Sequence, residues 1–357
     1  MLNLAIIGMG YMAGRHFENI IELKKGITII GGYDIREESQ VKAAKWGIKN
    51  YASPEDIYND KTIDIVLIAT PNDTHKEYSI NSLKSGKHVI CEKPAAMNAA
   101  ELEEILATAK ETQKCFFVHQ NRRWDTDYLT IRKILATGLL RNPYSIESRV
   151  QGSRPLYGWR AFKQNGGGLL LDWGVHILDQ ILDLIPQKIV SVSGHLHHLN
   201  NKEVDNAFTA FLRFEDGCSV IVNITTNCFD PLPRWHLSCQ DGTAVIEDWE
   251  VNGRIVKQTE STDISSFNDE HKFIENIVYT AAGPTRTMLP RPKETTQVLP
   301  LPKTSENSWD FFYQNVLDVI EDKAKPFITG HQATRVMKVI DAIFESDSSN
   351  TTIAVKI

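Results

Sequence analysis

The pattern of apolar and polar positions divides the chain into two parts with different predicted structure. In the first third, short apolar runs alternate with segments of helical periodicity, and repeated strand–helix units predict a doubly wound parallel sheet. We expect its buried strands at 4–7, 27–33, 64–69, 87–91 and 115–119, with helices that include 11–24 and 99–112.

Beyond residue 143 the pattern changes to short β-rich runs, which we expect at 144–152, 189–198, 207–214, 219–227, 234–239, 243–248 and 251–257. Asp216-Gly217 and Asp241-Gly242 lie between runs and are typical of hairpin turns, so a meander is expected. A helix over 166–185 should cover one face of this sheet. A loop-rich stretch with one short helix is expected over 260–303, then helices over 309–322 and 331–346.

The first expected strand leads into the glycine loop Gly8-Met9-Gly10-Tyr11-Met12-Ala13-Gly14, and a helix follows. Strand, glycine turn and helix in this order are the context of a dinucleotide site, with the pyrophosphate at the helix N-terminus. Asp34 ends the second strand at the spacing expected for a ribose 2′-hydroxyl, whereas a turn or cap role is the alternative. Its charge favours NAD over NADP, and Arg36 nearby softens that preference.

Ligands of open α/β sheets bind at the carboxyl ends of the strands, and this rule selects the other candidates for cofactor contact. These candidates are Gly8, Gly10, Tyr11, Met12, Ile35, Thr70, Pro71, Asn72, His75, Glu92, Lys93 and Gln120. The bulk of the Tyr11-Met12 pair could narrow the pyrophosphate site. A packed position in the first turn of a helix is the alternative for the His75 side chain.

The segment Gly166-Gly167-Gly168 opens an apolar helical stretch that carries Asp172, His176 and Asp179. On a regular helix these three side chains share one face, and the amides after the glycines would favour an anion or a dipole. An Asp and a His one turn apart can serve proton transfer. The alternative is a buried helix whose polar residues are caps and core hydrogen-bond partners.

The cleft should also receive Lys93, at the end of a strand, where a cation could stabilise a developing alkoxide. An irregular loop rich in aromatic residues precedes the glycines, and mixed aromatic and polar side chains suit a sugar. Our candidates for substrate contact are Lys93, Arg154, Tyr157, Trp159, Arg160, Asn165, Asp172, His176 and His236. Arg122 and Arg123 could meet a phosphate or a carboxylate, or equally be solvated charges.

Composition limits the function classes. The chain has 357 residues and a formal net charge of -6, so we expect two domains, 1–120 and 121–357, and no nucleic-acid partner. No apolar run reaches membrane-spanning length. The strand predicted directly after Met1 leaves no room for a leader, and scattered cysteines suit a reducing compartment, so we expect a cytoplasmic protein. His195, His197 and His198 lack partners at ligand spacing, so no metal is predicted.

Taken together, these motifs resemble the Gfo/Idh/MocA oxidoreductase family, named after glucose–fructose oxidoreductase and inositol dehydrogenase. The resemblance rests on the glycine loop at Gly8, on Thr70-Pro71-Asn72 with His75, on Glu92-Lys93-Pro94, and on the segment from Gly166 through Asp172, His176 and Asp179. It implies an N-terminal Rossmann domain, a C-terminal α+β domain with an open, mainly antiparallel sheet, and assembly into dimers or tetramers through the open face. It also implies that Lys93, Asp172 and His176 are catalytic, with Asp179 holding His176 or the helix.

Three classes of function remain open at this point. The first is an NAD-dependent dehydrogenase that transfers a hydride between nicotinamide and a hydroxyl-bearing carbon of a cyclic polyol, sugar or sugar derivative. The second is an NAD-retaining glycosidase or lyase that oxidises a sugar transiently and reduces it again. The third is a non-catalytic sensor, against which the intact Lys93, Asp172 and His176 argue.

Overall fold

The computed structural model describes residues 1–23, 26–259, 293–304 and 309–357. The first part of the chain forms a six-stranded parallel sheet with the strand order β3-β2-β1-β4-β5-β6. Its strands are β1 (Leu2–Ile7), β2 (Ile27–Tyr33), β3 (Lys49–Asn50), β4 (Ile65–Ile68), β5 (His88–Glu92) and β6 (Phe116–His119). The doubly wound parallel sheet predicted for this part is therefore confirmed.

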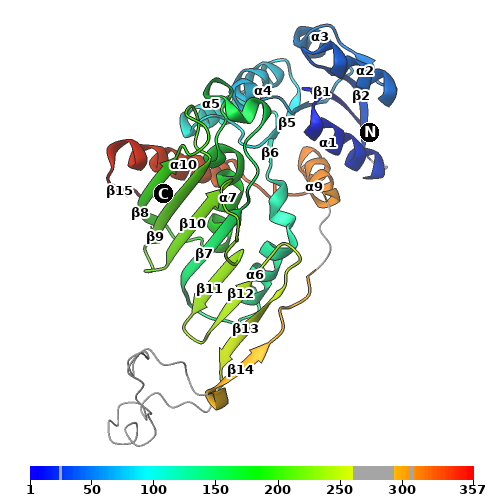
Figure 1. Ribbon diagram of the computed structural model, residues 1–357. Coiled ribbons are helices and arrows are strands. Elements are labelled where there is room, and N and C mark those ends of the chain that lie inside the picture. The colour runs from blue at the N-terminus through cyan, green and yellow to red at the C-terminus, as the bar shows by residue number, and fades with distance from the viewer. Residues whose placement is uncertain (24–25, 260–292, 305–308) are drawn as a thin grey trace, which may run out of the picture.

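Helices cover both faces of the parallel sheet, as its buried apolar central strands require (Figure 1). They are α1 (Tyr11–Leu23), α2 (Glu37–Trp46), α3 (Pro54–Asn59), α4 (His75–Lys84) and α5 (Ala99–Glu111). All four residues of the central strand β4 are buried, which explains why this strand reads as a continuous apolar run.

A second sheet of nine strands follows, in the order β14-β13-β12-β11-β7-β10-β9-β8-β15. Its strands are β7 (Pro143–Gln151), β8 (Ile189–His197), β9 (Ala207–Phe214), β10 (Ser219–Thr225), β11 (Trp235–Cys239), β12 (Gly242–Ile246), β13 (Gly253–Gln258), β14 (Thr296–Leu299) and β15 (Ile353–Ala354). The sheet is open and mainly antiparallel, as predicted.

Two details of the second sheet differ from the prediction. It is not a simple meander, because β7 inserts between β10 and β11 and pairs in parallel with β10. Residues 296–299, predicted as loop, pair with β13 as an edge strand. The short helix predicted over 260–303 cannot be assessed across 260–292, which lie outside the described residues.

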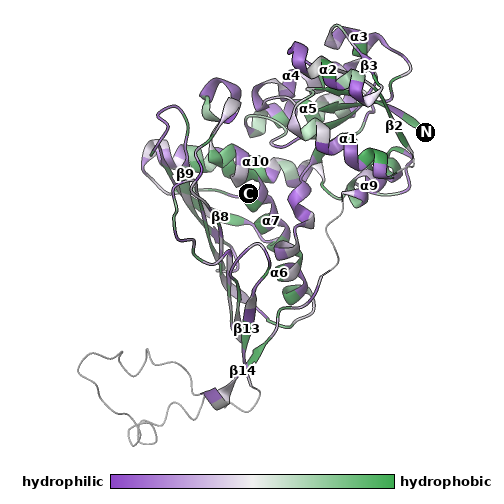
Figure 2. Ribbon diagram, turned by 45° about the vertical axis from the view of Figure 1, so that its right-hand side comes forward, coloured by the Kyte–Doolittle hydropathy of each residue, from purple (hydrophilic) through white to green (hydrophobic). Residues whose placement is uncertain are grey.

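The helices of the second part lie on one face of the nine-stranded sheet, as Figures 1 and 2 show for α6 (Thr126–Ala136), α7 (Val175–Leu184) and α10 (Gly330–Ser349). Strand residues alternate accordingly between buried and partly exposed positions, for example along β10 and β11. No helix of the described residues is long and apolar enough to cross a membrane.

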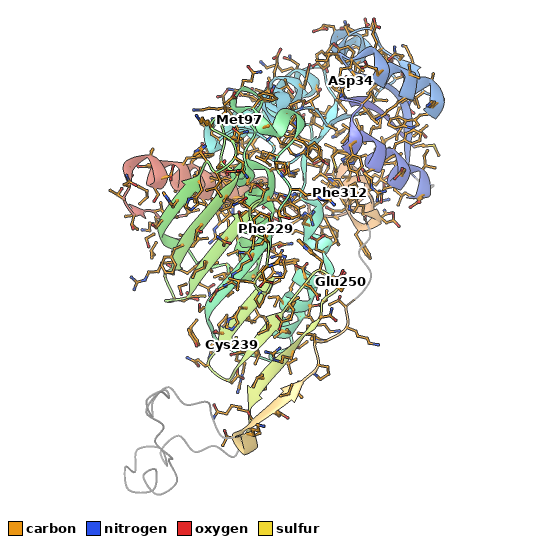
Figure 3. All side chains as sticks on the ribbon, in the orientation of Figure 1. Asp34, Met97, Phe229, Cys239, Glu250 and Phe312 are labelled. Carbon is orange, nitrogen blue, oxygen red and sulfur yellow. The ribbon has the colours of Figure 1, made fainter. Side chains whose placement is uncertain are left out.

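One helix from the second part returns to the first sheet. Helix α9 (Asp310–Ile320) places Phe312, labelled in Figure 3, and Val316 in the same apolar cluster as Ile6 and Leu67 of the parallel sheet. The two sheets are thus joined by more than the crossing near residue 120.

Candidate active site

The glycine loop between β1 and α1 has the geometry that a close-approaching ligand needs. Gly8 adopts φ +93, and a Cβ atom there would lie 2.7 Å from the carbonyl carbon of Ala69, so glycine is required. At Gly10, by contrast, an added Cβ would meet only the Arg36 guanidinium, at 3.8 Å. Tyr11 is 79% exposed at the start of α1, so its ring projects into solvent in this structure.

Asp34 lies just beyond β2 and fixes the glycine loop. Its carboxylate accepts hydrogen bonds from the backbone N–H of Met9 at 2.7 Å and from the Arg36 guanidinium at 3.1 Å. Burial alone would raise the pKa of Asp34, but the bonds from Arg36 and Met9 outweigh it and lower that pKa. An ionised acid at this place can receive a ribose hydroxyl and repels a 2′-phosphate.

The side chains of Asn72 and His75 hydrogen-bond to other loops of the protein. The Asn72 amide donates to the Gly166 carbonyl at 2.8 Å, which links the parallel sheet to the glycine run. His75 is completely buried, and its two ring nitrogens lie 2.7 Å from the Pro94 carbonyl and 3.0 Å from the Thr70 carbonyl. The predicted cofactor contact of His75 is therefore wrong, because both nitrogens are occupied by the two loops that it holds together.

Lys93 and Asp172 meet, although 79 positions separate them in the chain. The Lys93 ammonium donates to the backbone carbonyl and to Oδ1 of Asp172, both at 2.8 Å, and Arg160 Nε lies 3.1 Å from Oδ2. Burial alone would raise the pKa of Asp172, but the two cations outweigh it and lower that pKa. The Lys93 ammonium is thereby fixed in place, and a fixed cation can stabilise a developing alkoxide.

The predicted helix over 166–185 begins with an irregular turn. Residues Leu170–Gly174 form a π-helical turn, and α7 starts only at Val175. This insertion, a feature often found at functional sites, removes Asp172 from the regular helical frame of His176 and Asp179.

The amides of the glycine run are occupied by protein groups, so the anion or dipole expected at this helix start comes from the chain itself. Gly168 has φ +104, and its N–H donates to the Arg160 carbonyl. The next two amides donate to Asp205, Leu169 to its carbonyl and Leu170 to its carboxylate at 2.8 Å. A Cβ atom at Gly168 would lie 2.2 Å from the Asp205 carboxylate, so the glycine permits this close clamp.

His176 follows the π turn and is only 5% exposed. Burial lowers its pKa well below the usual value, and the charges of Lys93 and Arg122 lower it further. Its Nδ1 is buried and has no partner within the described part of the chain. The ring is therefore neutral at pH 7, the state in which an imidazole can accept a proton.

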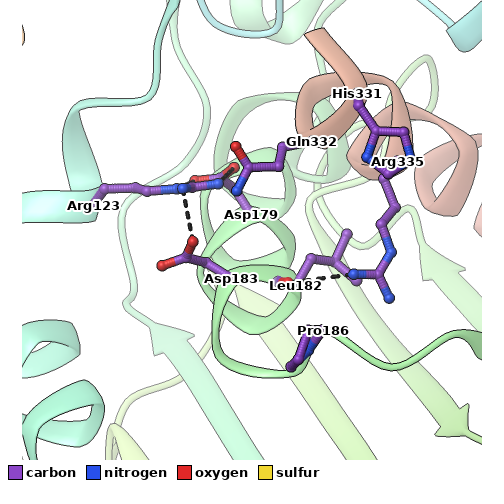
Figure 4. A pocket seen from close by; sticks show the side chains of 8 residues that line it. All are labelled: Arg123, Asp179, Leu182, Asp183, Pro186, His331, Gln332 and Arg335. Carbon is purple, nitrogen blue, oxygen red and sulfur yellow. Dashed lines mark hydrogen bonds and ion pairs between the residues drawn. The ribbon is translucent and has the colours of Figure 1, made fainter. Parts of the chain in front are cut away.

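Of the two roles expected for Asp179, holding His176 or holding the helix, the contacts agree with the second. Its two oxygens receive Nε and Nη2 of Arg123 at 2.7 and 2.8 Å, and Arg123 also reaches Asp183 at 2.9 Å. Figure 4 shows this set beside Arg335 in a cavity of about 230 Å³ between α7 and α10. Arg123 and Asp179 thus tie the chain crossing to α7, away from the Lys93–Asp172 pair.

The structure adds a stack of arginine and tryptophan side chains that sequence reasoning missed. The Arg122 guanidinium lies 4.0 Å from the Trp173 ring centre and 5.7 Å from that of Trp249, while Arg234 lies 4.8 Å from Trp249. The Trp173 ring in turn contacts the His176 ring edge-on, with 6.0 Å between centres. Trp249, whose ring centre lies 5.9 Å from that of Trp173, is 47% exposed and adds accessible aromatic surface to this stack.

The other predicted substrate residues take different places. Arg154 and Tyr157 are exposed, Trp159 carries Arg160 over its ring at 4.5 Å, and Asn165 is half-buried. His236 is wrong as a cleft residue. It alternates with Trp235, which points toward α6 and donates to Asp127, so His236 lies on the opposite face of the sheet.

These residues fit a nicotinamide dinucleotide. Gly8 and Gly10 leave the backbone bare, Asp34 presents an ionised acid, and the buried amide oxygens of Asn72 and Gln120 have no partner in the described ranges. The fold and this site together define a dinucleotide-binding oxidoreductase.

Comparison with known proteins agrees. A family profile described as "Oxidoreductase family, NAD-binding Rossmann fold" matches residues 2–120, and one described as "GFO/IDH/MocA C-terminal domain" matches 128–245. The chain belongs to the GFO/IDH/MocA family of oxidoreductases, which confirms the resemblance seen in its motifs.

Individual relatives and solved structures share between a quarter and two fifths of their aligned residues with this chain. A solved NAD-binding protein from Listeria innocua is 37% identical, with a TM-score of 0.86, and the match covers 99% of this chain and 96% of that one. The scyllo-inositol 2-dehydrogenase (NADP(+)) IolW of Bacillus subtilis is 26% identical over 84% of this chain and 81% of its own length. The scyllo-inositol 2-dehydrogenase (NAD(+)) of the same organism is 28% identical, but over only 60% of this chain and 64% of its own.

Proposed function

We propose that the protein is an NAD-dependent dehydrogenase that transfers a hydride between nicotinamide and a hydroxyl-bearing carbon of a cyclic polyol, sugar or sugar derivative. The observation that carries this proposal is the convergence of Lys93, Asp172 and His176. A fixed ammonium and a carboxylate meet at the carboxyl end of β5, where open α/β sheets bind their ligands, and the neutral imidazole lies near enough for the charge of Lys93 to lower its pKa.

Each of the three side chains has a separate role in the proposed oxidation. The neutral His176 ring accepts the proton of the substrate hydroxyl as general base. Lys93 hydrogen-bonds the same oxygen and stabilises its developing negative charge. Asp172 fixes the Lys93 ammonium from two directions, through its carbonyl and its carboxylate. Bound nicotinamide would supply the hydride acceptor, or the donor in reduction.

The substrate class follows from the surroundings of this centre. The Arg122, Trp173 and Trp249 stack offers apolar ring faces beside polar groups, which matches a ring that bears several hydroxyls. Two relatives of the chain are named as scyllo-inositol dehydrogenases, and this agrees with a cyclic polyol or a related sugar.

The proposed preference for NAD rests on Asp34. Its carboxylate is ionised and ends the second strand, so a 2′-phosphate there would meet like charge. One scyllo-inositol relative is named for NADP and another for NAD, so the relatives alone do not decide between the cofactors. The residues that would hold the dinucleotide are the remaining candidates of the loops, Gly8, Gly10, Tyr11, Met12, Ile35, Arg36, Thr70, Pro71, Asn72 and Gln120.

We also propose a division of labour, in which 1–120 hold the dinucleotide and 121–357 hold the substrate and a second copy of the chain. The nine-stranded sheet supports this, since its helices in the described ranges cover one face only. Phe211 is 42% exposed on β9 and Val298 is 68% exposed on β14. Sedimentation velocity of Phe211→Asp beside the unaltered protein tests this, and a monomeric unaltered protein contradicts it.

Replacement of His176 tests the proposed mechanism. We expect His176→Ala to lower turnover about 10²-fold, the effect of losing a general base, with the melting temperature little changed. Turnover within about threefold of the unaltered enzyme contradicts the general-base role. Aglycone release from a glycoside without added NAD and without net NADH would instead identify a closed redox cycle on the same scaffold.

A further inference from the structure

A buried polar network lies directly behind the catalytic lysine of the proposed mechanism. Glu92, the last residue of β5, is 4% exposed. Its Oε1 lies 2.8 Å from His16 Nε2 and 3.0 Å from His119 Nδ1, while its Oε2 accepts the backbone N–H of Lys93 at 3.2 Å. His16 Nδ1 hydrogen-bonds the Tyr313 hydroxyl. His16, His119 and Tyr313 are all completely buried.

The proton positions in this network follow from the charge of Glu92. Burial alone would raise its pKa, but the bonds from His119 and His16 outweigh it and hold that pKa well below the usual value. An ionised carboxylate can only accept, so His16 Nε2 and His119 Nδ1 both donate to it. The other ring nitrogen of His16, Nδ1, hydrogen-bonds the Tyr313 hydroxyl. Burial lowers the pKa of His119 to about 4, so this ring is neutral.

The network joins four elements that are distant in the chain. His16 lies on α1, the helix that begins at the glycine loop, and Glu92 ends the strand that leads into Lys93. His119 ends β6, and Tyr313 lies on α9. The network therefore ties Glu92 to α1, β6 and α9, and one further bond, from the Lys93 N–H to Glu92, links the Lys93 backbone to it. Such a support keeps a catalytic side chain within the narrow range that chemistry needs.

Glu92 also places a negative charge behind the site. Asp172 accepts from the Lys93 ammonium and Glu92 accepts from the Lys93 backbone N–H, so two carboxylates contact this lysine. Glu92 acts on His176 as well, since its charge raises the pKa of that ring against the effects of burial and of Lys93. Removal of the Glu92 charge should therefore change the catalytic pair even where the fold is kept.

We propose that Glu92 is a positioning residue that holds Lys93 in its catalytic place through His16, His119 and Tyr313. This inference rests on the proposed role of Lys93. The ligand atoms of His16, Glu92 and His119 lie within 4.8 Å of one another, a spacing that a cation could also use. Both ring nitrogens, however, lie at hydrogen-bond length from the same carboxylate oxygen, which is the geometry of a proton-filled network.

A matched pair at His119 separates positioning from mere packing. Asn keeps a donor close to the place of the histidine Nδ1, whereas Leu fills similar space without a donor. We expect His119→Leu to lower kcat between about 10-fold and about 10²-fold, as a displaced catalytic group does, and His119→Asn to stay within about threefold of the unaltered enzyme. The KM for NAD should change little in either variant. Equal kcat values for the two variants at equal melting temperature overturn the proposal.

Glu92→Gln tests the charge at nearly constant shape. The kcat of this variant should fall by a factor similar to that of His119→Leu. The acid limb of its kcat/KM profile should move to lower pH, because the anion that stabilises a protonated His176 is gone. Tyr313→Phe, which keeps Glu92 and both histidines, should lower the melting temperature and leave the acid limb in place. An acid limb that does not move in Glu92→Gln contradicts the proposal, as does metal that copurifies with the enzyme in stoichiometric amount and is lost in this variant.

A structural readout separates this proposal from the proposed function. Crystal structures of the two His119 variants show directly whether Lys93 Nζ keeps its 2.8 Å contact with the Asp172 carbonyl. We expect the contact to be kept in His119→Asn and lost in His119→Leu. If the unaltered protein oxidises no polyol, the proposed function fails, while these structures still decide the role of the network. Lys93 in the same place in both variants overturns it.

Discussion

Replacement of Asp205 by Asn should stabilise the protein at neutral pH. The Asp205 carboxylate is 3% exposed and clamps the start of the π turn by accepting the Leu170 N–H at 2.8 Å. It has no cationic side chain within hydrogen-bond distance among the described residues. Burial raises its pKa from 3.8 to about 6, more than its backbone hydrogen bonds can offset. Asn has the same shape, keeps an oxygen that can accept from Leu170, and carries no charge.

The magnitude follows from the two pKa values. A carboxyl group with a pKa of about 6 in the folded state and 3.8 in the unfolded state binds its proton more tightly when the protein is folded. Its ionisation therefore destabilises the fold fully above about pH 6, and the penalty fades as the pH falls toward 3.8. The difference of about two pKa units corresponds to about 3 kcal/mol, which we regard as the upper limit of the gain in Asp205→Asn at pH 8.

Urea unfolding followed by tryptophan fluorescence at pH 8, 6.5, 5 and 4 measures this difference. The advantage of Asp205→Asn should be largest at pH 8 and should vanish near pH 4. Asp241→Asn is the control of opposite sign, because the bonds from Arg141 and the charge of Lys257 outweigh burial and lower the pKa of Asp241. That variant should be less stable than the unaltered protein at pH 8. A difference for Asp205→Asn that is negative at pH 8, or independent of pH, refutes the reasoning.

Three further predictions concern the site. Asp34→Ala should raise the ratio of kcat/KM with NADP to kcat/KM with NAD by about tenfold or more, since the like charge facing a 2′-phosphate is removed. Arg36→Ala should lower the same ratio. A ratio that is unchanged in Asp34→Ala contradicts the role of Asp34. Gly8→Ala should abolish NAD binding in calorimetry, because the added Cβ would lie 2.7 Å from the Ala69 backbone. Gly47→Ala is the control and should bind NAD normally. Gly47 also lies in the left-handed region, but a Cβ there would have nothing within 4 Å. Because burial and nearby cations lower the pKa of His176, kcat/KM for oxidation should stay level as the pH falls from 8 to 6.5. A decline of kcat/KM that begins above pH 6.5 and disappears in His176→Asn contradicts this prediction.

Local patterns were sufficient to predict the parallel sheet and its ligand-binding end. The buried strands read as continuous apolar runs, and the glycine loop at Gly8 requires a backbone conformation that the sequence itself indicates. The approximate bounds of β8 to β13 followed from their short β-rich runs. Sequence could not predict the insertion of β7 between β10 and β11, because that pairing depends on packing between segments far apart.

The site was predictable in part for the same reason. Lys93 and Asp172 were both predicted as site residues. Their contact with each other and with Arg160 depends on the π turn, which shifts the helical register by less than a turn and has no clear sequence signal. Asp179 lies in the same regular helix as His176, yet it pairs with Arg123, which comes from a distant segment. The stack at Trp249 and the bond between His16 and Tyr313, which are 297 positions apart, involve residues with no common local pattern.

We propose that Lys93, Asp172 and His176 together promote hydride transfer from a hydroxyl-bearing carbon to NAD. The most direct test follows absorbance at the NADH wavelength with purified protein and NAD, and then NADP, across a panel of inositols, free sugars and sugar phosphates. We expect net NADH formation with at least one compound, and a loss of turnover of about 10²-fold or more in Lys93→Met, whose unfolding temperature should stay close to that of the unaltered protein. Absence of net NADH across the panel from protein that nevertheless binds NAD, or undiminished turnover in Lys93→Met, would contradict it.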